Sequence, residues 1–136
     1  MAGGAAGASD AVERGLALLD RGSLEGAVEQ FEAATNLDLN CLEAYGWLAT
    51  ALARLGRFDD AHRNADHALW LDPLSAWAWN RKGTVFFEMR EWPMALRCFR
   101  KAVELEPAFA AAAENVRRTE ALAGVNAGVV DGKRGE

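Results

Sequence analysis

A repeat of 34 residues constrains the fold of this chain more than any other feature of its sequence. When the chain is shifted against itself by 34 residues, similar residues align from Ala8 to Phe109, which gives three copies. Small residues and large apolar residues recur in separate columns, as in Gly15, Ala49, Gly83; Ala27, Ala61, Ala95; and Leu18, Leu52, Phe86. A fixed period of this length is typical of stacked supersecondary units, each too small to bury its own apolar face.

Each copy is expected to form two helices joined by a short turn. In the second copy, apolar residues follow the three-and-four spacing of one helical face over 42–55 and again over 58–71. Small columns would let two antiparallel helices approach closely, and the large columns would fill the space around their crossing. The pattern therefore predicts helices at about 9–21, 24–37, 42–55, 58–71, 76–90 and 92–105.

The turns carry residues that end or begin helices. Gly56 follows the first helix of the second copy, where helices commonly end in a left-handed residue, and Pro73 would stop the second helix. Asn40 and Ser75 are predicted N-caps. The third turn lacks glycine but places Pro93 in the first turn of the next helix, where its missing N–H is tolerated.

These columns resemble the tetratricopeptide repeat family, whose unit is a helix–turn–helix. The third copy matches most completely, the second has Ala65 where an aromatic is usual, and the first has Ala11 for the aromatic and Leu39 for the proline. The matching residues of the third copy are Trp79, Gly83, Phe86, Ala95, Phe99, Ala102 and Pro107. The resemblance implies an all-α, right-handed α-solenoid of three repeats, at about 8–41, 42–75 and 76–109, with a capping helix at 110–123.

The ends of the chain and its composition set further expectations. Residues 1–8 are predicted to be flexible, because their Gly and Ala residues offer no large apolar group to bury. Residues 124–136 are predicted to form a disordered tail, because they are rich in glycine and contain no aromatic residue. The net charge is −5, and 51% of the residues are hydrophobic, as in ordinary globular proteins. An acidic chain without a basic stripe is a poor candidate for nucleic-acid binding.

A cytoplasmic protein is expected from the cysteines and the apolar runs. The two cysteines, Cys41 and Cys98, fall too far apart in the repeat to form a disulfide framework, which favours a reducing compartment. The first residues lack the pattern of a secretory signal, and the chain has no apolar run long enough to span a membrane.

The sequence contains little that is typical of a catalytic or metal-binding site. His62 and His67 lie five residues apart, which is the wrong spacing for two metal ligands on one helical face. The sequence shows no phosphate-binding loop or nucleophile motif. We therefore expect no enzyme activity, no metal and no cofactor.

The resemblance to the repeat family implies that the first helices and the capping helix line a concave groove for a protein or peptide partner. The groove-lining residues expected here are Val12, Leu16, Trp47, Thr50, Trp77, Asn80, Arg81, Thr84, Phe87 and Arg118. Trp47 and Trp77 lie outside the core columns, so each is a candidate anchor for a partner side chain. The alternative is that the two tryptophans pack on each other and close the groove. Arg81 could grip a ligand carboxylate or pair with Glu88 or Glu43.

Some members of this family hold the C-terminal carboxylate of heat-shock chaperones in a clamp of Lys, Asn and Arg side chains. The corresponding positions here are Val12, Leu16, Trp47, Trp77 and Arg81, of which only Arg81 matches. The sequence therefore predicts a non-enzymatic adaptor that binds a peptide segment without such a clamp. A self-assembling homo-oligomeric scaffold, in which the acidic first repeat meets the basic third repeat, is the alternative.

Overall fold

The computed structural model describes the backbone of residues 2–134 and the side chains of residues 4–124. Within this range the chain is all-α, as predicted. Its helices are α1 (Ala2–Asp20), α2 (Leu24–Leu37), α3 (Leu42–Arg54), α4 (Phe58–Leu71), α5 (Ala76–Glu88), α6 (Trp92–Leu105) and α7 (Ala110–Arg134). None of the helices in the described range is both long and apolar enough to cross a membrane.

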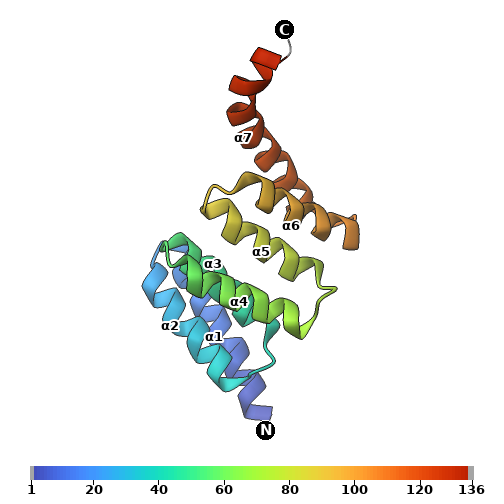
Figure 1. Cartoon of the computed structure of the whole chain (residues 1–136). Helices are drawn as coiled ribbons and strands as arrows, with labels where there is room; N and C mark the ends of the chain where they lie inside the picture. Colours follow the sequence, from blue (N-terminus) through green and yellow to red (C-terminus); the bar gives the residue numbers. More distant parts are fainter. Residues whose placement is uncertain (1, 135–136) are drawn as a thin grey trace.

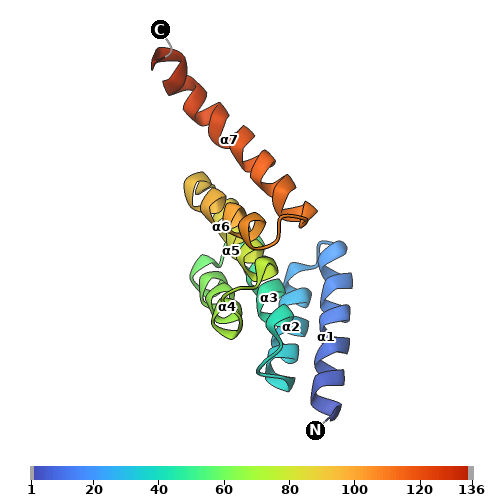
Figure 2. The same ribbon diagram turned by 90° about the vertical axis from the view of Figure 1, so that its right-hand side faces the viewer.

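The helices stack as three antiparallel pairs with α7 at the end, which confirms the solenoid (Figure 1). Helix α3 contacts both α1 and α5, whereas each of α2 and α4 contacts its own partner and the next helix along the chain. The first helices of the pairs therefore form an inner layer, and the second helices lie outside it. Figure 2 shows α7 leaving the stack at the end opposite to the N-terminus.

Close crossings inside the pairs depend on the small-residue columns. A methyl group placed on Gly15 would lie 2.4 Å from the ring of Phe31, and one on Gly83 would lie 2.5 Å from the ring of Phe99. Both phenylalanines are fully buried. The glycine therefore makes room for an aromatic ring of the partner helix, which is the role that the repeat pattern predicted.

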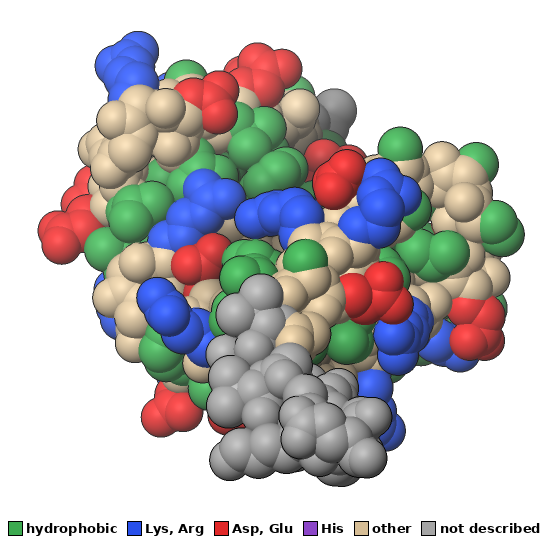
Figure 3. All heavy atoms as spheres, turned by 90° about the horizontal axis from the view of Figure 1, so that it is seen from above, with side chains coloured by type: hydrophobic (Ala, Val, Ile, Leu, Met, Phe, Trp, Pro, Cys, Tyr) green, Lys and Arg blue, Asp and Glu red, His purple; other side chains and the backbone are tan. Residues whose placement is uncertain are grey.

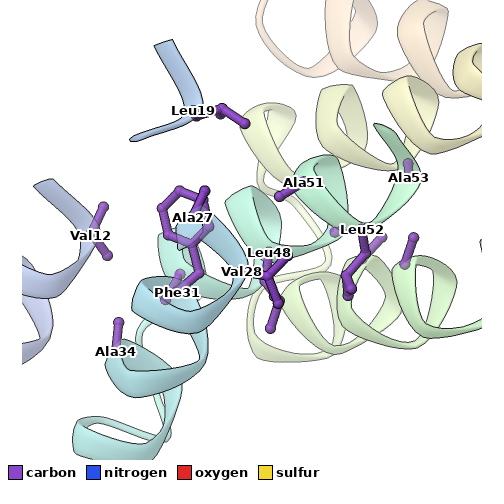
Figure 4. Close-up of a cluster of buried hydrophobic side chains, with 14 of the residues drawn as sticks. Val12, Leu19, Ala27, Val28, Phe31, Ala34, Leu48, Ala51, Leu52 and Ala53 are labelled. Carbon is purple, nitrogen blue, oxygen red and sulfur yellow. The ribbon is translucent and has the colours of Figure 1, made fainter. Parts of the chain in front are cut away.

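The main core runs through the first two pairs (Figure 4). Phe31 and Val28 of α2 and Leu48 and Leu52 of α3 are buried there among small alanines such as Ala27. A second cluster of buried alanines joins α5, α6 and α7. Burial of apolar surface in these two clusters supplies most of the stability that a single pair of helices would lack.

The predicted caps are confirmed in part. The Ser75 hydroxyl accepts a hydrogen bond from the Ala78 N–H at 3.1 Å, and Pro93 lies in the first turn of α6. The prediction for Asn40 is wrong, because Cys41 occupies the N-cap position of α3. The Asn40 N–H instead donates to the Asp38 carboxylate at 3.0 Å, so the acid closes a turn.

Both ends of the chain are more helical than expected. Helix α1 begins at Ala2 rather than at about residue 9, so the segment predicted to be flexible is helical in the structure. Gly4 and Gly7 face Leu37 at the end of α2, and their lack of side chains lets α1 run close to it. Helix α7 continues to Arg134, into the segment predicted to be disordered. That segment has glycines, which weaken a helix, but no proline to stop it.

The turn between α5 and α6 carries local strain. Gly22, Gly56 and Arg90 occupy the same position in the three repeats, and all have positive φ values, of 79°, 81° and 61°. Glycine adopts this conformation freely, whereas a residue with a side chain does so at a cost of about 1 kcal/mol. Arg90 is exposed, and no carboxylate among the described residues forms an ion pair with it that would offset this cost.

We therefore expect Arg90→Gly to raise the free energy of unfolding by about 1 kcal/mol, because it relieves the left-handed strain. Chemical denaturation followed by circular dichroism measures this difference. Gly56→Ala at the equivalent turn is the matched control and should lower stability by a similar amount. An Arg90→Gly variant that is no more stable than the original chain would show that the turn is unstrained.

Candidate functional site

The ten predicted groove residues separate into buried and accessible sets. Val12, Thr50 and Asn80 are 6%, 0% and 1% exposed, so their side chains belong to the interior of the stack. Leu16, Trp47, Trp77, Arg81, Thr84 and Phe87 are partly buried, and Arg118 is exposed. The accessible members lie on α1, α3, α5 and α7. They concentrate on α5, a helix of the inner layer of the fold.

Trp47, Trp77 and Arg81 form one cluster. The two indole rings meet edge to face, with centroids 5.6 Å apart. The Arg81 guanidinium carbon lies 4.7 Å from the Trp47 ring centroid and 5.6 Å from that of Trp77. Cation–π contact of this kind stabilises a guanidinium that has left water. The tryptophans therefore do pack on each other, while both keep part of their surface accessible.

Gly46 on α3 positions Trp77. A methyl group on Gly46 would lie 2.3 Å from the Trp77 ring, so the indole can rest on α3 only because residue 46 has no side chain. Sequence reasoning missed this residue. Its signal was a glycine in the middle of an otherwise strong helical pattern, which often marks a close approach.

Arg81 is a largely buried cation, and no described carboxylate forms an ion pair with it. One of its terminal nitrogens donates to the Thr50 hydroxyl at 3.2 Å, and its buried Nε–H has no partner among the described residues. Burial, reinforced by the charge of Arg54, lowers the pKa of Arg81 to about 10. The side chain remains charged at neutral pH. The predicted alternatives of an ion pair with Glu88 or Glu43 are not formed by the residues that the structure describes.

Two hollows flank this cluster on the inner layer. The first has a volume of about 470 Å³ and lies between the beginnings of α3 and α5. Its walls are Leu42, Glu43, Trp47, Ser75 and Trp77. We call it the aromatic hollow, because the two indole rings supply its largest surfaces.

The second hollow lies between α3, α5 and α7 and is smaller, at about 130 Å³. We call it the basic hollow, because arginines from three helices line it, together with one acid. Its lining residues are Arg54, Arg81, Thr84, Phe87, Glu88, Phe99, Asn115 and Arg118. Figure 3, which looks down from the α7 end, shows a row of basic side chains beside apolar ones on the surface.

A hydrogen-bond chain fixes the α7 side of the basic hollow. The Asn115 amide donates to the Asn80 side-chain oxygen at 2.9 Å, and Arg118 donates to the Asn115 oxygen at 3.3 Å. The Arg118 guanidinium also lies 5.0 Å from the Phe87 ring centroid. Phe87 itself packs edge to face on Trp92 of α6, with centroids 5.2 Å apart. The hollow is therefore bounded by side chains that hold one another in place.

The two histidines have packing neighbours. His62 lies against Phe86, with ring centroids 4.7 Å apart, and His67 lies between Tyr45 and Trp70. Among the side chains that the structure describes, no three His, Cys, Asp or Glu residues gather in a way that could hold a metal ion. Cys41 and Cys98 are both free thiols.

Gly46→Ala should disturb the tryptophan cluster, because the added methyl would overlap the Trp77 ring. We expect a loss of about 1–3 kcal/mol in the free energy of unfolding, as for other overpacked sites, and a changed near-UV circular dichroism signal. Gly124→Ala is the matched control, since a methyl there meets no atom within 4 Å. Unchanged stability and spectrum in Gly46→Ala would mean that Trp77 does not rest on α3.

Comparison with protein families supports the repeat pattern. Two models described as tetratricopeptide repeat match the chain, one over residues 76–109 and the other over residues 12–62 and 48–92. Together these matches extend from residue 12 to residue 109.

Known proteins with similar sequences and folds were also found. Hsp70-Hsp90 organizing protein 3 of Arabidopsis thaliana is 26% identical over 92 residues, which cover 68% of this chain and only 16% of that protein. The Arabidopsis OM64 TPR domain is 26% identical with a TM-score of 0.71, covering 86% of this chain and 97% of that one. The first TPR of Spaghetti (RPAP3) bound to HSP90 peptide SRMEEVD is 23% identical with a TM-score of 0.72, covering 88% and 95%.

Proposed function

We propose that the inner layer of this chain, which belongs to the tetratricopeptide repeat family, binds a peptide segment of a protein partner. The chain would act as an adaptor in the cytoplasm, without catalysis of its own. The observation that carries the proposal is the aromatic hollow, in which Trp47 and Trp77 stay partly accessible beside Arg81.

Physical chemistry favours peptide capture at this hollow. Tryptophan gives large contact area at low entropic cost and is enriched among the residues that dominate binding energy. Gly46 and the Arg81 guanidinium hold the two rings in place before a ligand arrives, so less ordering is required on binding. An apolar side chain of the partner would fill the space between Leu42, Trp47 and Trp77.

The similar proteins suggest which ligands to compare. The Spaghetti domain is described as bound to an HSP90 peptide, and the Arabidopsis relative is called an Hsp70-Hsp90 organizing protein. Here the clamp positions on α1 and α3 hold Val12, Leu16 and Trp47, none of which has the Lys or Asn donor of a clamp. Of the clamp positions on α5, only Arg81 matches. We therefore propose that this chain binds an internal peptide segment rather than a chain terminus.

The first test uses peptides selected from a random display library on the immobilised chain. Trp47→Ala should weaken a selected peptide by about 10-fold or more, as expected for an aromatic anchor, measured by isothermal titration calorimetry. Trp70→Ala is the matched control, because this tryptophan is 75% exposed on the outer helix α4. Equal affinity in both variants would place the peptide elsewhere. Light scattering on the same samples tests the alternative of self-assembly, which requires a mass above that of the monomer.

The second test uses the peptide SRMEEVD with a free and with an amidated C-terminus. Because the clamp positions on α1 and α3 lack suitable donors, any affinity should be the same for the two forms within about 2-fold. Fluorescence anisotropy of labelled peptides measures both. A loss of about 10-fold or more on amidation would correspond to one charged contact with the terminal carboxylate and would overturn the proposal of an internal segment.

A further inference from the structure

We infer that the basic hollow between α3, α5 and α7 binds an oxyanion group carried by the bound peptide, either a phosphorylated or a carboxylate side chain. The inference rests on the proposed function, because it names the second contact of the same peptide. It concerns a different set of residues: Arg54, Arg118, Thr84 and Asn115 together with Arg81.

The charges in the hollow favour an anion. Arg54, Arg81 and Arg118 bring three positive charges from three helices, and Glu88 brings one negative charge. None of the three arginines is in an ion pair with a described carboxylate. By contrast, Arg57 just before α4, Arg63 on α4 and Arg100 on α6 each pair with an acid. The inner cations are thus left with an uncompensated charge of +2 facing one small space.

An unused hydrogen-bond donor on Arg81 points to the same ligand. The Nε–H of Arg81, a residue that lines the basic hollow, is buried and has no partner among the described residues. A buried donor without a partner is costly, so native structures rarely leave one unless a ligand or water satisfies it. Arg81 lines the basic hollow, and its guanidinium contacts the ring of Trp47, which lines the aromatic hollow. An oxyanion beside it could accept from the guanidinium.

The geometry also limits what the ligand can be. A volume of about 130 Å³ suits a single phosphate or carboxylate group rather than a second large side chain. The hollow is shared by α7 and the first helices of two repeats, so the anion would tie the capping helix to the stack. Because Arg81 connects the basic hollow to Trp47 and Trp77 of the aromatic hollow, we expect one extended peptide to reach both.

The experiment titrates the purified chain with sodium phosphate, and separately with sodium acetate, at pH 7.5 and constant ionic strength. Binding is read by tryptophan fluorescence and by the ¹⁵N-edited NMR signals of the arginine Nε–H groups. We expect saturable phosphate binding, with a dissociation constant on the order of 1 mM. Arg54→Gln and Arg118→Gln should each weaken it by about 10-fold, the value of one charge-assisted hydrogen bond. Both arginines are exposed, so circular dichroism should show unchanged helicity.

Two further variants sharpen the test. Glu88→Gln removes the acid that lines the hollow and should tighten phosphate binding by about 3-fold or more. Arg117→Gln is the matched control, because Arg117 lies beside Arg118 on α7 but pairs with Glu114 at 2.9 Å. It should bind phosphate like the original chain.

Each result decides the inference. Phosphate binding at least 10-fold tighter than acetate binding would support a phosphorylated side chain, and equal binding would support a carboxylate. Absence of saturation by either anion, or equal binding by Arg54→Gln, Arg118→Gln and Arg117→Gln, would overturn the site. That failure would leave the peptide proposal standing, since the Trp47→Ala test of the aromatic hollow uses no anion.

Discussion

The contact between a glycine of one helix and a buried phenylalanine of its partner is the constraint on which the rest of the stack depends. It occurs as Gly15 against Phe31 and as Gly83 against Phe99. Such crossings bring the two helices of a pair close enough to exclude water, and they fix the rotation of each helix about its axis. Once the rotation of α5 is fixed, its face that carries Trp77 and Arg81 looks inward, against Trp47 of α3.

A glycine also makes room for an aromatic ring on the inner layer, but there the ring is partly accessible. Gly46 admits the ring of Trp77 between two repeats, just as Gly15 and Gly83 admit rings within a repeat. Here the ring stays partly accessible, and it also lies 5.6 Å from the Arg81 guanidinium. Gly46 lowers the stability of α3 by about 1 kcal/mol relative to alanine, but it allows Trp77 to form part of an ordered aromatic surface. Order of this kind lowers the entropy lost when a ligand binds.

The fold was largely predictable because a repeat states each structural requirement three times. Helix bounds in the interior agree to within two residues for α2 to α6, since small columns, large columns and turn residues all indicate the same elements. The ends were less predictable, because residues 1–8 and 124–136 lie outside the repeat. The contacts of Gly4 and Gly7 with Leu37 depend on tertiary packing, which the local sequence pattern does not predict. The candidate site was predictable as a list of positions, but burial of Val12 and Asn80 emerged only when the pairs were stacked.

Arg81 explains why the site could not be derived from residue types alone. A guanidinium largely withdrawn from water, without a carboxylate partner among the described residues, is unfavourable, and the same burial lowers its pKa to about 10. Two tryptophan rings and the Thr50 hydroxyl offset part of that cost, but the Nε–H is left without a described partner. An interior optimised for stability alone would place an apolar side chain at this position. A cation at this position is understandable if an anionic ligand accepts the remaining hydrogen bond of Arg81. The interaction that is missing in the folded chain is then formed on binding and adds to the affinity.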